Sequence, residues 1–225
     1  LWRNAMTGTP MAAAALAGVP AGVQAQGVWA GRRQLFVRFA GEAETATMYT
    51  SAALVRELER QLSRSKYHSI AIGGRDPLAN QAFLIAALEA AKPPVPVMLD
   101  TDGQRPETLK TLAPFLALAQ VTVEFWVPDA TLANVIETIS QAARAKCAHA
   151  LVLCPRDDTS DGQLLRVIEQ AHGVSAETQV VIHPPSPTGE QPMLDRRWAA
   201  LLDQAMATHA DTRLALRLPP PAGLR

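Results

Sequence analysis

A glycine turn that carries one charge of each sign is the stretch of this sequence best suited to bind a ligand. Residues 69–78 read Ser-Ile-Ala-Ile-Gly-Gly-Arg-Asp-Pro-Leu, so an apolar run ends at Gly73 and Gly74, and Arg75 and Asp76 follow. Glycine lets the backbone turn tightly and expose its N–H groups, and α/β proteins bind ligands at such turns after parallel strands. A plain connection between a strand and a helix is the alternative interpretation.

Polar residues also follow two other apolar runs. Residues 100–103 read Asp-Thr-Asp-Gly, and His183 ends the run at residues 179–183. If these runs are parallel strands, their polar ends lie at the same edge of the sheet as the glycine turn. A satisfied polar residue at a strand end is the alternative for His183. The predicted ligand-binding residues are Gly73, Gly74, Arg75, Asp76, Thr101, Asp102 and His183.

Acidic residues are frequent in the loops predicted at this edge. Paired carboxylates can perform acid–base chemistry or bind a metal, although acids in solvated loops are commoner. None of the histidines has the spacing of metal ligands, and we predict no metal site. The sequence contains no nucleophile elbow, P-loop or dinucleotide fingerprint. The acids are Glu42, Glu44, Asp76, Asp100, Asp102, Asp129, Asp157 and Asp158.

The two cysteines, Cys147 and Cys154, are too few for a disulfide framework, which favours a reducing compartment such as the cytoplasm. They bracket a predicted strand, whose rise places them about 23 Å apart. At that separation the two thiols cannot share one metal cluster. A small buried core residue is the simplest interpretation of Cys154.

Composition excludes several classes of partner. The chain has 225 residues, 48% of them hydrophobic, and its 21 basic and 21 acidic residues give no net charge. A nucleic-acid-binding protein needs a basic patch or aromatic stacking platforms, and aromatic residues make up only 5% of this chain. No apolar run approaches the ~20 residues of a membrane span. We therefore expect neither nucleic acid nor membrane as a partner.

The first residues are harder to interpret. Residues 11–19 are apolar and rich in alanine, with Arg3 upstream, which is also the pattern of a weak signal peptide. Leu1 is not an initiator methionine, so a fragment or a processed chain is a further alternative. We predict that residues 1–27 form an irregular arm that packs on the domain.

From residue 28 onward, apolar runs alternate with amphipathic segments. This alternation predicts a parallel sheet with right-handed crossovers, and its six units are too few for an eight-fold barrel. The sequence thus predicts an α/β domain over residues 28–218, either a partial (β/α)6 TIM-like barrel or a doubly wound sheet, and a tail at 219–225. The predicted strands are 34–39, 69–72, 95–99, 121–127, 148–153, 179–183 and 213–217, and the predicted helices are 51–65, 80–91, 106 onward with a break at Pro114, 130–145, 160–171 and 194–208.

Four motifs, in order along this domain, resemble those of the radical S-adenosylmethionine (SAM) family. Residues 31–41 resemble the strand before the family's cluster loop, and residues 72–78 resemble its Ser-Gly-Gly-Asp/Glu-Pro-Leu turn, which in the family holds the SAM amino group. Residues 99–103 resemble its Asp-Thr-Asn-Gly strand end, and residues 181–187 resemble a late strand. The chain is most similar to the pyruvate formate-lyase activating enzymes and the 7-carboxy-7-deazaguanine synthases, which implies a partial barrel of radical SAM type.

The motif that defines this family is missing. The family binds a four-iron, four-sulfur cluster with Cys-x3-Cys-x2-Cys after the first strand, and here Glu42, Ala46 and Tyr49 hold those positions. Such clusters need thiolate ligands. Arg75 replaces a glycine of the SAM turn, where it would repel the SAM ammonium and attract a carboxylate or phosphate.

The resemblance and the missing cysteines together lead to three hypotheses. The first is a catalytically inactive radical SAM-like protein that serves as a binding, scaffold or regulatory subunit, beside an active radical SAM enzyme or its protein substrate. The second is an enzyme that reuses the barrel mouth for non-radical chemistry on an anionic small molecule. The third is a radical enzyme whose cluster ligands come from a partner. We expect no cofactor, and the resemblance leaves SAM or a related nucleoside as a candidate ligand.

Overall fold

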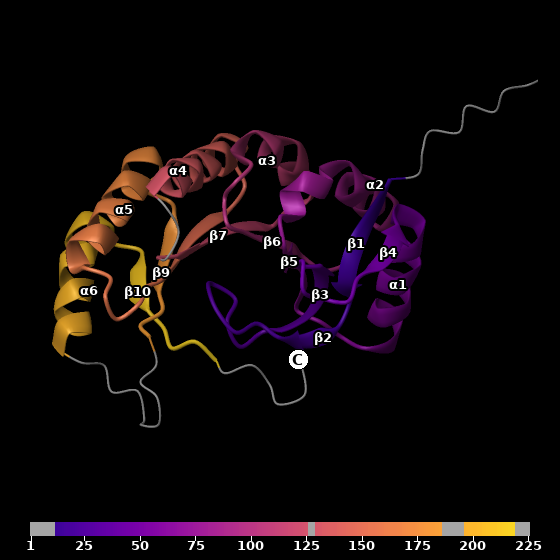
Figure 1. Ribbon diagram of the computed structural model, residues 1–225, viewed down its shortest axis with the longest axis horizontal. Coiled ribbons are helices and arrows are strands. Elements are labelled where there is room, and N and C mark those ends of the chain that lie inside the picture. The colour runs from indigo at the N-terminus through magenta and orange to yellow at the C-terminus, as the bar shows by residue number, and fades with distance from the viewer. Residues whose placement is uncertain (1–11, 126–128, 186–195, 219–225) are drawn as a thin grey trace, which may run out of the picture.

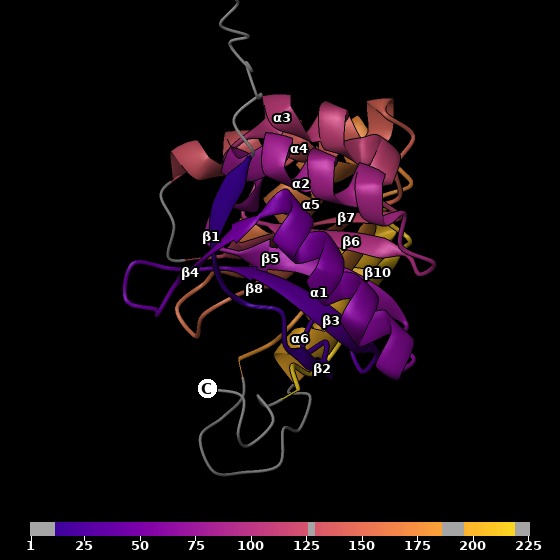
Figure 2. The same cartoon turned by 90° about the vertical axis from the view of Figure 1, so that its right-hand side faces the viewer.

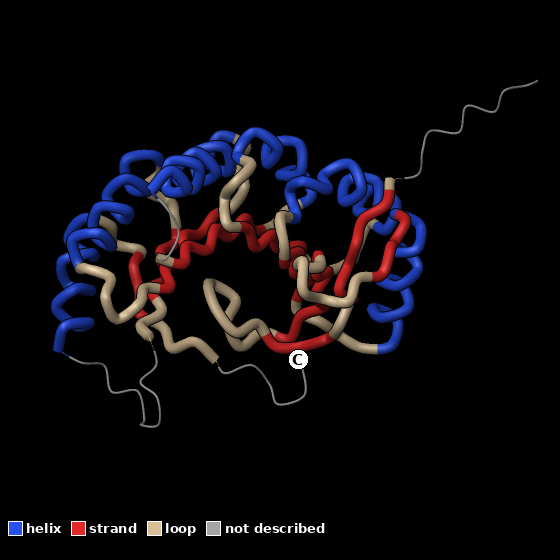
Figure 3. Tube along the Cα trace, viewed as in Figure 1, coloured by secondary structure: helices blue, strands red, loops and turns tan. Residues whose placement is uncertain are grey.

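A curved sheet forms the centre of the molecule, and helices cover its outer face (Figures 1 and 3). The computed structural model describes residues 12–125, 129–185 and 196–218. Within them the sheet has ten strands, ordered β10-β9-β8-β7-β6-β5-β3-β1-β4, with β2 paired to β3. The strands are β1 (Ala13–Gly18), β2 (Ala21–Val23), β3 (Arg33–Phe39), β4 (Thr47–Thr50), β5 (Ser69–Gly74), β6 (Val97–Thr101), β7 (Leu118–Glu124), β8 (His149–Cys154), β9 (Gln179–Ile182) and β10 (Thr212–Leu214).

All neighbouring strands from β3 to β10 pair in parallel. The α-helices that follow them are α1 (Ser51–Arg64), α2 (Gln81–Ala91), α3 (Pro106–Leu112), α4 (Asp129–Arg144), α5 (Asp161–Val174) and α6 (Arg196–Thr208). The predicted α/β class and the alternation of strands and helices are therefore confirmed. Because only one face of the sheet carries helices, the sheet curls into an open barrel and is not doubly wound (Figure 3).

Local sequence explains where the helices begin and break. The side chain of Thr50 accepts a hydrogen bond from the Ala53 N–H at 3.1 Å and caps α1 from the position before Ser51, the first residue of the predicted helix. Ser160 forms a full capping box with Gln163 at the start of α5. The predicted break at Pro114 is confirmed, because α3 ends at Leu112 and a 3-10 turn follows over Ala113–Phe115.

The prediction of an irregular arm over residues 1–27 was wrong for the part that the structure describes. Strand β1 lies between β3 and β4 and is antiparallel to both, and β2 is antiparallel to β3. In Figure 2, where this edge of the sheet faces the viewer, β1 and β4 lie on the far side of β3 from β5. Alanine has low strand propensity, but Ala14 and Leu16 are buried in the core, and this burial overrides the propensity. Residues 41–50, which lie between a predicted strand and a predicted helix and were expected to form a loop, likewise end in a strand, β4.

Other strand boundaries differ by two or three residues. The strand predicted at 95–99 is Val97–Thr101, and the one predicted at 121–127 begins earlier, at Leu118. Gln120 belongs to this strand, since its backbone pairs with β6 and β8. Residues 126–127, 186–192, 194–195 and 219–225 of the predicted elements lie outside the described residues.

The main core lies between the sheet and the helices. One cluster joins β1 to β6 with α1 to α3, and a second joins β7 to β9 with α4 to α6. Among the described residues, no helix combines the length and the apolar character that a membrane crossing requires.

Gly74 lets β3 and β5 approach closely, and a substitution there tests how much this contact matters. Its φ is +94°, and a Cβ there would lie 2.3 Å from the Phe39 carbonyl oxygen. We expect Gly74→Ala to destabilise the fold by about 1–3 kcal/mol, because both backbone strain and a backbone clash result. Urea denaturation measures this loss.

Gly162 provides the control, because a Cβ there meets nothing within 4 Å in the first turn of α5. Gly162→Ala should leave stability unchanged or raise it by up to about 1 kcal/mol. Equal losses in the two variants would refute the role given to the β3–β5 contact.

Candidate functional site

The inner face of the open barrel carries two layers of side chains, because alternate residues of each strand point inward. The lower layer is apolar and is built from Ala71, Met98, Leu118 and Ala150. The upper layer, toward the carboxyl ends of the strands, is polar. Its members include Asp100, Gln120, Thr122, Glu124 and His183.

A loop between β2 and β3, residues 24–32, fills the barrel interior above the apolar layer. In Figures 1 and 3 it projects from the β2–β3 side into the space that the curved sheet encloses. Its Val28 and Trp29 pack against the apolar layer, and Val28 also contacts the cluster of Val152, Cys154 and Val181. We call residues 24–32 the inner loop.

Hydrogen bonds fasten the inner loop to the opposite side of the barrel. The Gly27 N–H donates to His183 Nε2 at 2.8 Å, and the Val28 N–H donates to Gln120 Oε1 at 3.2 Å. The Leu218 N–H donates to the Ala25 carbonyl at 2.9 Å. The loop thus ties the first strands to the last ones.

Only glycine fits at position 27. Its φ is +79°, and a Cβ would lie 1.9 Å from Gln120 Oε1. The close approach of the loop backbone to Gln120 therefore depends on the missing side chain.

His183 is buried, with 2% of its surface exposed, and both ring nitrogens have backbone partners. Because Nε2 accepts from Gly27, Nδ1 carries the proton and donates to the Ala215 carbonyl at 2.7 Å. Burial lowers the pKa of His183, the Ala215 carbonyl opposes this shift, and Arg217 and Arg213 add to it. His183 is therefore a polar residue at a strand end whose hydrogen bonds are satisfied, which was the alternative interpretation.

A cavity of about 320 Å³ opens at the carboxyl ends of β5, β6 and β7. This mouth cavity has the size of a small-molecule site, near the lower end of the usual range. Of the predicted ligand-binding residues, Gly74, Thr101 and Asp102 line it, whereas Gly73, Arg75, Asp76 and His183 do not. Its polar lining consists of Asp100, Thr101, Asp102, Thr122, Glu124 and Thr131.

Two carboxyl groups in this lining have perturbed acidity. Burial raises the pKa of Asp100, although Thr122, which donates to Asp100 at 2.6 Å, and the side chains of Gln120 and Gln26 oppose the shift. Burial also raises the pKa of Glu124, and the negative charge of Asp100 adds to this effect. Arg217 opposes both shifts and lies 3.8 Å from Glu124.

Ion pairs hold the charged residues of the glycine turn outside the cavity. Arg75 is exposed and pairs with Glu42 at 3.1 Å. Asp76 has a φ of +42°, caps the turn at Ala79, and accepts both ends of the Arg105 guanidinium at 2.8–3.0 Å. In this arrangement neither side chain lines the cavity.

The loop at 41–50 is fixed by its own contacts. Glu44 pairs with Arg38 at 2.6 Å and accepts from the Gly41 N–H at 2.9 Å. Ala46 is exposed, and Tyr49 lies in β4 opposite Ala14. This loop therefore offers carboxylates, a methyl group and a phenol.

Both thiols are buried. Cys154 ends β8 beside Glu124 in the upper layer, and burial raises its pKa to about 11. Cys147 precedes β8 at the other end of the barrel, where burial also raises its pKa. No group of three or more His, Cys, Asp and Glu side chains among the described residues is arranged to hold a metal ion.

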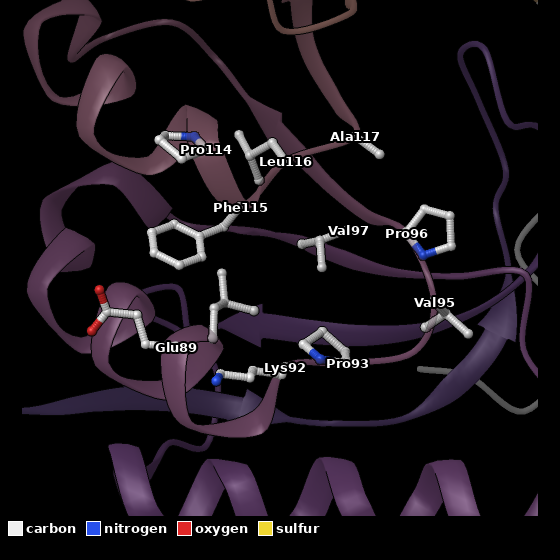
Figure 4. Close-up of a pocket in the computed structure, with 11 residues that line it drawn as sticks. Glu89, Lys92, Pro93, Val95, Pro96, Val97, Pro114, Phe115, Leu116 and Ala117 are labelled. Carbon is white, nitrogen blue, oxygen red and sulfur yellow. The ribbon is translucent and has the colours of Figure 1, made fainter.

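A larger cavity, of about 740 Å³, lies at the amino ends of β6 and β7, away from the mouth. Figure 4 shows its apolar walls, which include Val97, Phe115 and Leu116, with Glu89 and Lys92 at one side. It lacks the carboxyl pair and hydroxyl groups of the mouth cavity.

Sequence reasoning missed the inner loop and most of the polar layer. Gln26, Gln120, Thr122, Glu124 and Arg217 were not among the predicted residues. The alternation of Gln120, Thr122 and Glu124 along one strand was the available signal, since it places three polar side chains on one face.

Comparisons with known proteins agree with this architecture. No family model matches the chain. The 7-carboxy-7-deazaguanine synthase of Methanothermobacter thermautotrophicus is 24% identical over 197 residues, which cover 81% of this chain and 74% of that protein. The crystal structure of QueE from Escherichia coli matches with a TM-score of 0.58 at 13% identity, over 92% of this chain and 95% of that one.

The chain has a radical SAM-like fold. The partial barrel predicted from the order of the motifs is thereby confirmed.

His183 makes the inner loop sensitive to pH. Because its pKa is lowered in the folded state, the unfolded chain binds more protons below pH 6.5, the ordinary value for histidine. The neutral His183 side chain contributes its full share of the free energy of unfolding above that pH. This share declines as the pH falls toward the pKa of His183 in the folded state. We expect the free energy of unfolding to fall more steeply below pH 6.5 in the wild type than in His183→Gln, whose amide does not titrate.

Urea denaturation of the two proteins across this pH range measures the difference. His183→Leu should lose about 1–3 kcal/mol even at neutral pH, because the buried Gly27 N–H would have no acceptor. Identical pH slopes in the wild type and His183→Gln would contradict the proposed hydrogen bond.

Proposed function

We propose that this protein is a radical SAM-like protein without radical chemistry, which acts by binding a ligand or partner. The observation that carries the proposal is the loop at 41–50, where the resemblance aligns Glu42, Ala46 and Tyr49 with the family's cluster cysteines. These groups do not fit a four-iron, four-sulfur cluster, which needs thiolates. Glu42 is moreover engaged with Arg75.

The two thiols do not compensate for this loop. Cys147 and Cys154 lie at opposite ends of β8, both are buried, and each has a raised pKa that disfavours the thiolate. Without a cluster the fold has no electron source for cleaving SAM.

The filled interior also supports a binding role. The inner loop occupies the space above the apolar layer, and three hydrogen bonds hold it there. A substrate could enter that space only if the loop moved. The mouth cavity and the outer surface then remain for binding, and we propose a protein partner, an active radical SAM enzyme or its substrate protein, for the outer surface.

A non-radical enzyme is the second candidate, and the carboxyl pair of Asp100 and Glu124 favours it. Groups whose pKa is raised toward neutrality are suited to acid–base chemistry. Their different surroundings, a threonine hydroxyl for Asp100 and an arginine for Glu124, would let one act as acid and the other as base.

Anaerobic reconstitution with iron and sulfide tests the main proposal. We expect no iron–sulfur absorption and no cluster signal in electron paramagnetic resonance after the protein is desalted. Cys154→Ser serves as the control, because it removes the one thiol in the polar layer and identifies iron held there. One cluster per chain, retained in Cys154→Ser, would overturn the proposal.

A further inference from the structure

Two histidine rings meet at the end of the barrel opposite the mouth. His172 lies in the last turn of α5, and His209 follows the last residue of α6 and precedes β10. The two helices lie side by side on the outer face of the sheet (Figure 1). Nδ1 of His172 is 3.0 Å from Nδ1 of His209, and the ring planes are 78° apart. Neither ring belongs to the site at the mouth, so this contact needs an explanation of its own.

Hydrogen bonds fix the protonation of His209. Its Nε2 contacts the Thr178 carbonyl oxygen, which can only accept, so Nε2 carries the ring proton. Nδ1 of the neutral ring then has an unprotonated lone pair, which faces His172. The ring is held in place, because His209 has only 1% of its surface exposed and its backbone bonds to Ala205 and Thr212.

His172 is the movable member of the pair, since it is exposed at the end of its helix. Because His209 offers a lone pair, Nδ1 of His172 donates, and a single proton lies between the two nitrogen atoms. A neutral imidazole can carry its proton on either nitrogen. Transfer of this proton through solvent to Nε2 of His172 would therefore leave two lone pairs directed at the same gap.

The bond from His209 to Thr178 is an independent indication of a ligand in that gap. Histidines that bind a metal through one ring nitrogen almost always donate the other N–H to a carboxylate, a backbone carbonyl or water. This partner fixes the tautomer and the orientation of the ring, and it raises the basicity of the binding nitrogen. His209 has such a partner in the Thr178 carbonyl, while its other nitrogen faces a second imidazole.

The distance between the two rings is also close to that of a metal site. Zn–N bonds of about 2.0–2.1 Å in a tetrahedral site place two ligand nitrogens about 3.3 Å apart. The observed separation of 3.0 Å has to increase by only about 0.3 Å to reach that value. The exposed ring of His172 can make this adjustment while His209 stays in place.

We propose that His172 and His209 bind Zn²⁺ or a similar divalent transition-metal ion through their Nδ1 atoms. Imidazole suits such ions, whereas Mg²⁺ prefers oxygen ligands. Water completes the coordination, because the site has two protein ligands and the described residues contain no group of three or more His, Cys, Asp and Glu side chains arranged for a metal.

A bound ion would connect the ends of α5 and α6 to the turn that precedes β9. This inference goes beyond the proposed function and does not depend on it, since the two histidines lie at the opposite end of the barrel from the mouth cavity and from the loop at 41–50.

Calorimetric titration of the full chain, without an affinity tag, tests the proposal with Zn²⁺ and, as a matched probe, Mg²⁺. We expect one Zn²⁺ to bind per chain and Mg²⁺ to give no heat. His172→Ala should weaken Zn²⁺ binding by roughly 100-fold, because two linked ligands bind far more tightly than either one alone. The exposed position of His172 makes this variant the one least damaging to the fold.

His68→Gln is the control variant. His68 is also partly exposed, but its Nδ1 contacts the Ser69 hydroxyl at 2.9 Å and its ring packs against Trp29, far along the sheet from the histidine pair. Its Zn²⁺ affinity should equal that of the wild type. If His172→Ala does not fold, nuclear magnetic resonance of the wild type replaces it, and Zn²⁺ should shift the ring signals of His172 and His209 and leave those of His68 unchanged.

Three results would overturn the inference: no heat with Zn²⁺, equal Zn²⁺ affinity in His172→Ala and the wild type, or an equal loss in His68→Gln. The proposed function has its own test in the reconstitution with iron and sulfide. A protein that assembles no cluster and binds no Zn²⁺ retains the proposed function and loses this inference, whereas one that assembles a cluster and binds Zn²⁺ at the histidine pair loses only the proposed function.

Discussion

The hydrogen bond from the Gly27 N–H to His183 Nε2 is the constraint on which the interior of this barrel depends. An open barrel exposes its inner face, and here that face has a lower layer of apolar side chains that need cover. The inner loop provides the cover with Val28 and Trp29, and its bond to His183 fixes how deeply it enters. Gly27 is required because any side chain there would collide with Gln120. The filled interior thus depends on this bond, together with the bonds from Val28 to Gln120 and from Leu218 to Ala25.

The arrangement of the mouth follows from this filling. With the interior closed, Asp100, Thr122 and Glu124 are the members of the polar upper layer that line the mouth cavity, and burial raises the pKa of Asp100 and that of Glu124. Three arginines at this end of the barrel, Arg38, Arg75 and Arg105, pair with Glu44, Glu42 and Asp76 instead of with the acids of the cavity. Ion pairs at the rim therefore stabilise the loops, and the cavity keeps a surplus of negative charge.

Much of the fold could be predicted from the sequence, but little of the site. Apolar runs such as Ile70 to Ile72 and clear caps such as Ser160 are local signals, and they placed the strands and helices to within a few residues. The role of His183 depends on a backbone amide 156 residues away, which no local pattern encodes. Arg75 was expected to face a ligand, yet its partner, Glu42, lies on a loop whose path depends on how β4 pairs with β1.

Closure of the barrel also bears on how the chain folds. The contact between Gly27 and His183 and the bond from Leu218 to Ala25 join segments more than 150 residues apart, so closing them costs much conformational entropy. The parallel strands between them can pair one after another without these contacts. The inner loop should therefore be the last segment to become ordered during folding and among the first to detach under stress. Access to the interior would then require only a local opening, at far lower free energy than unfolding of the sheet.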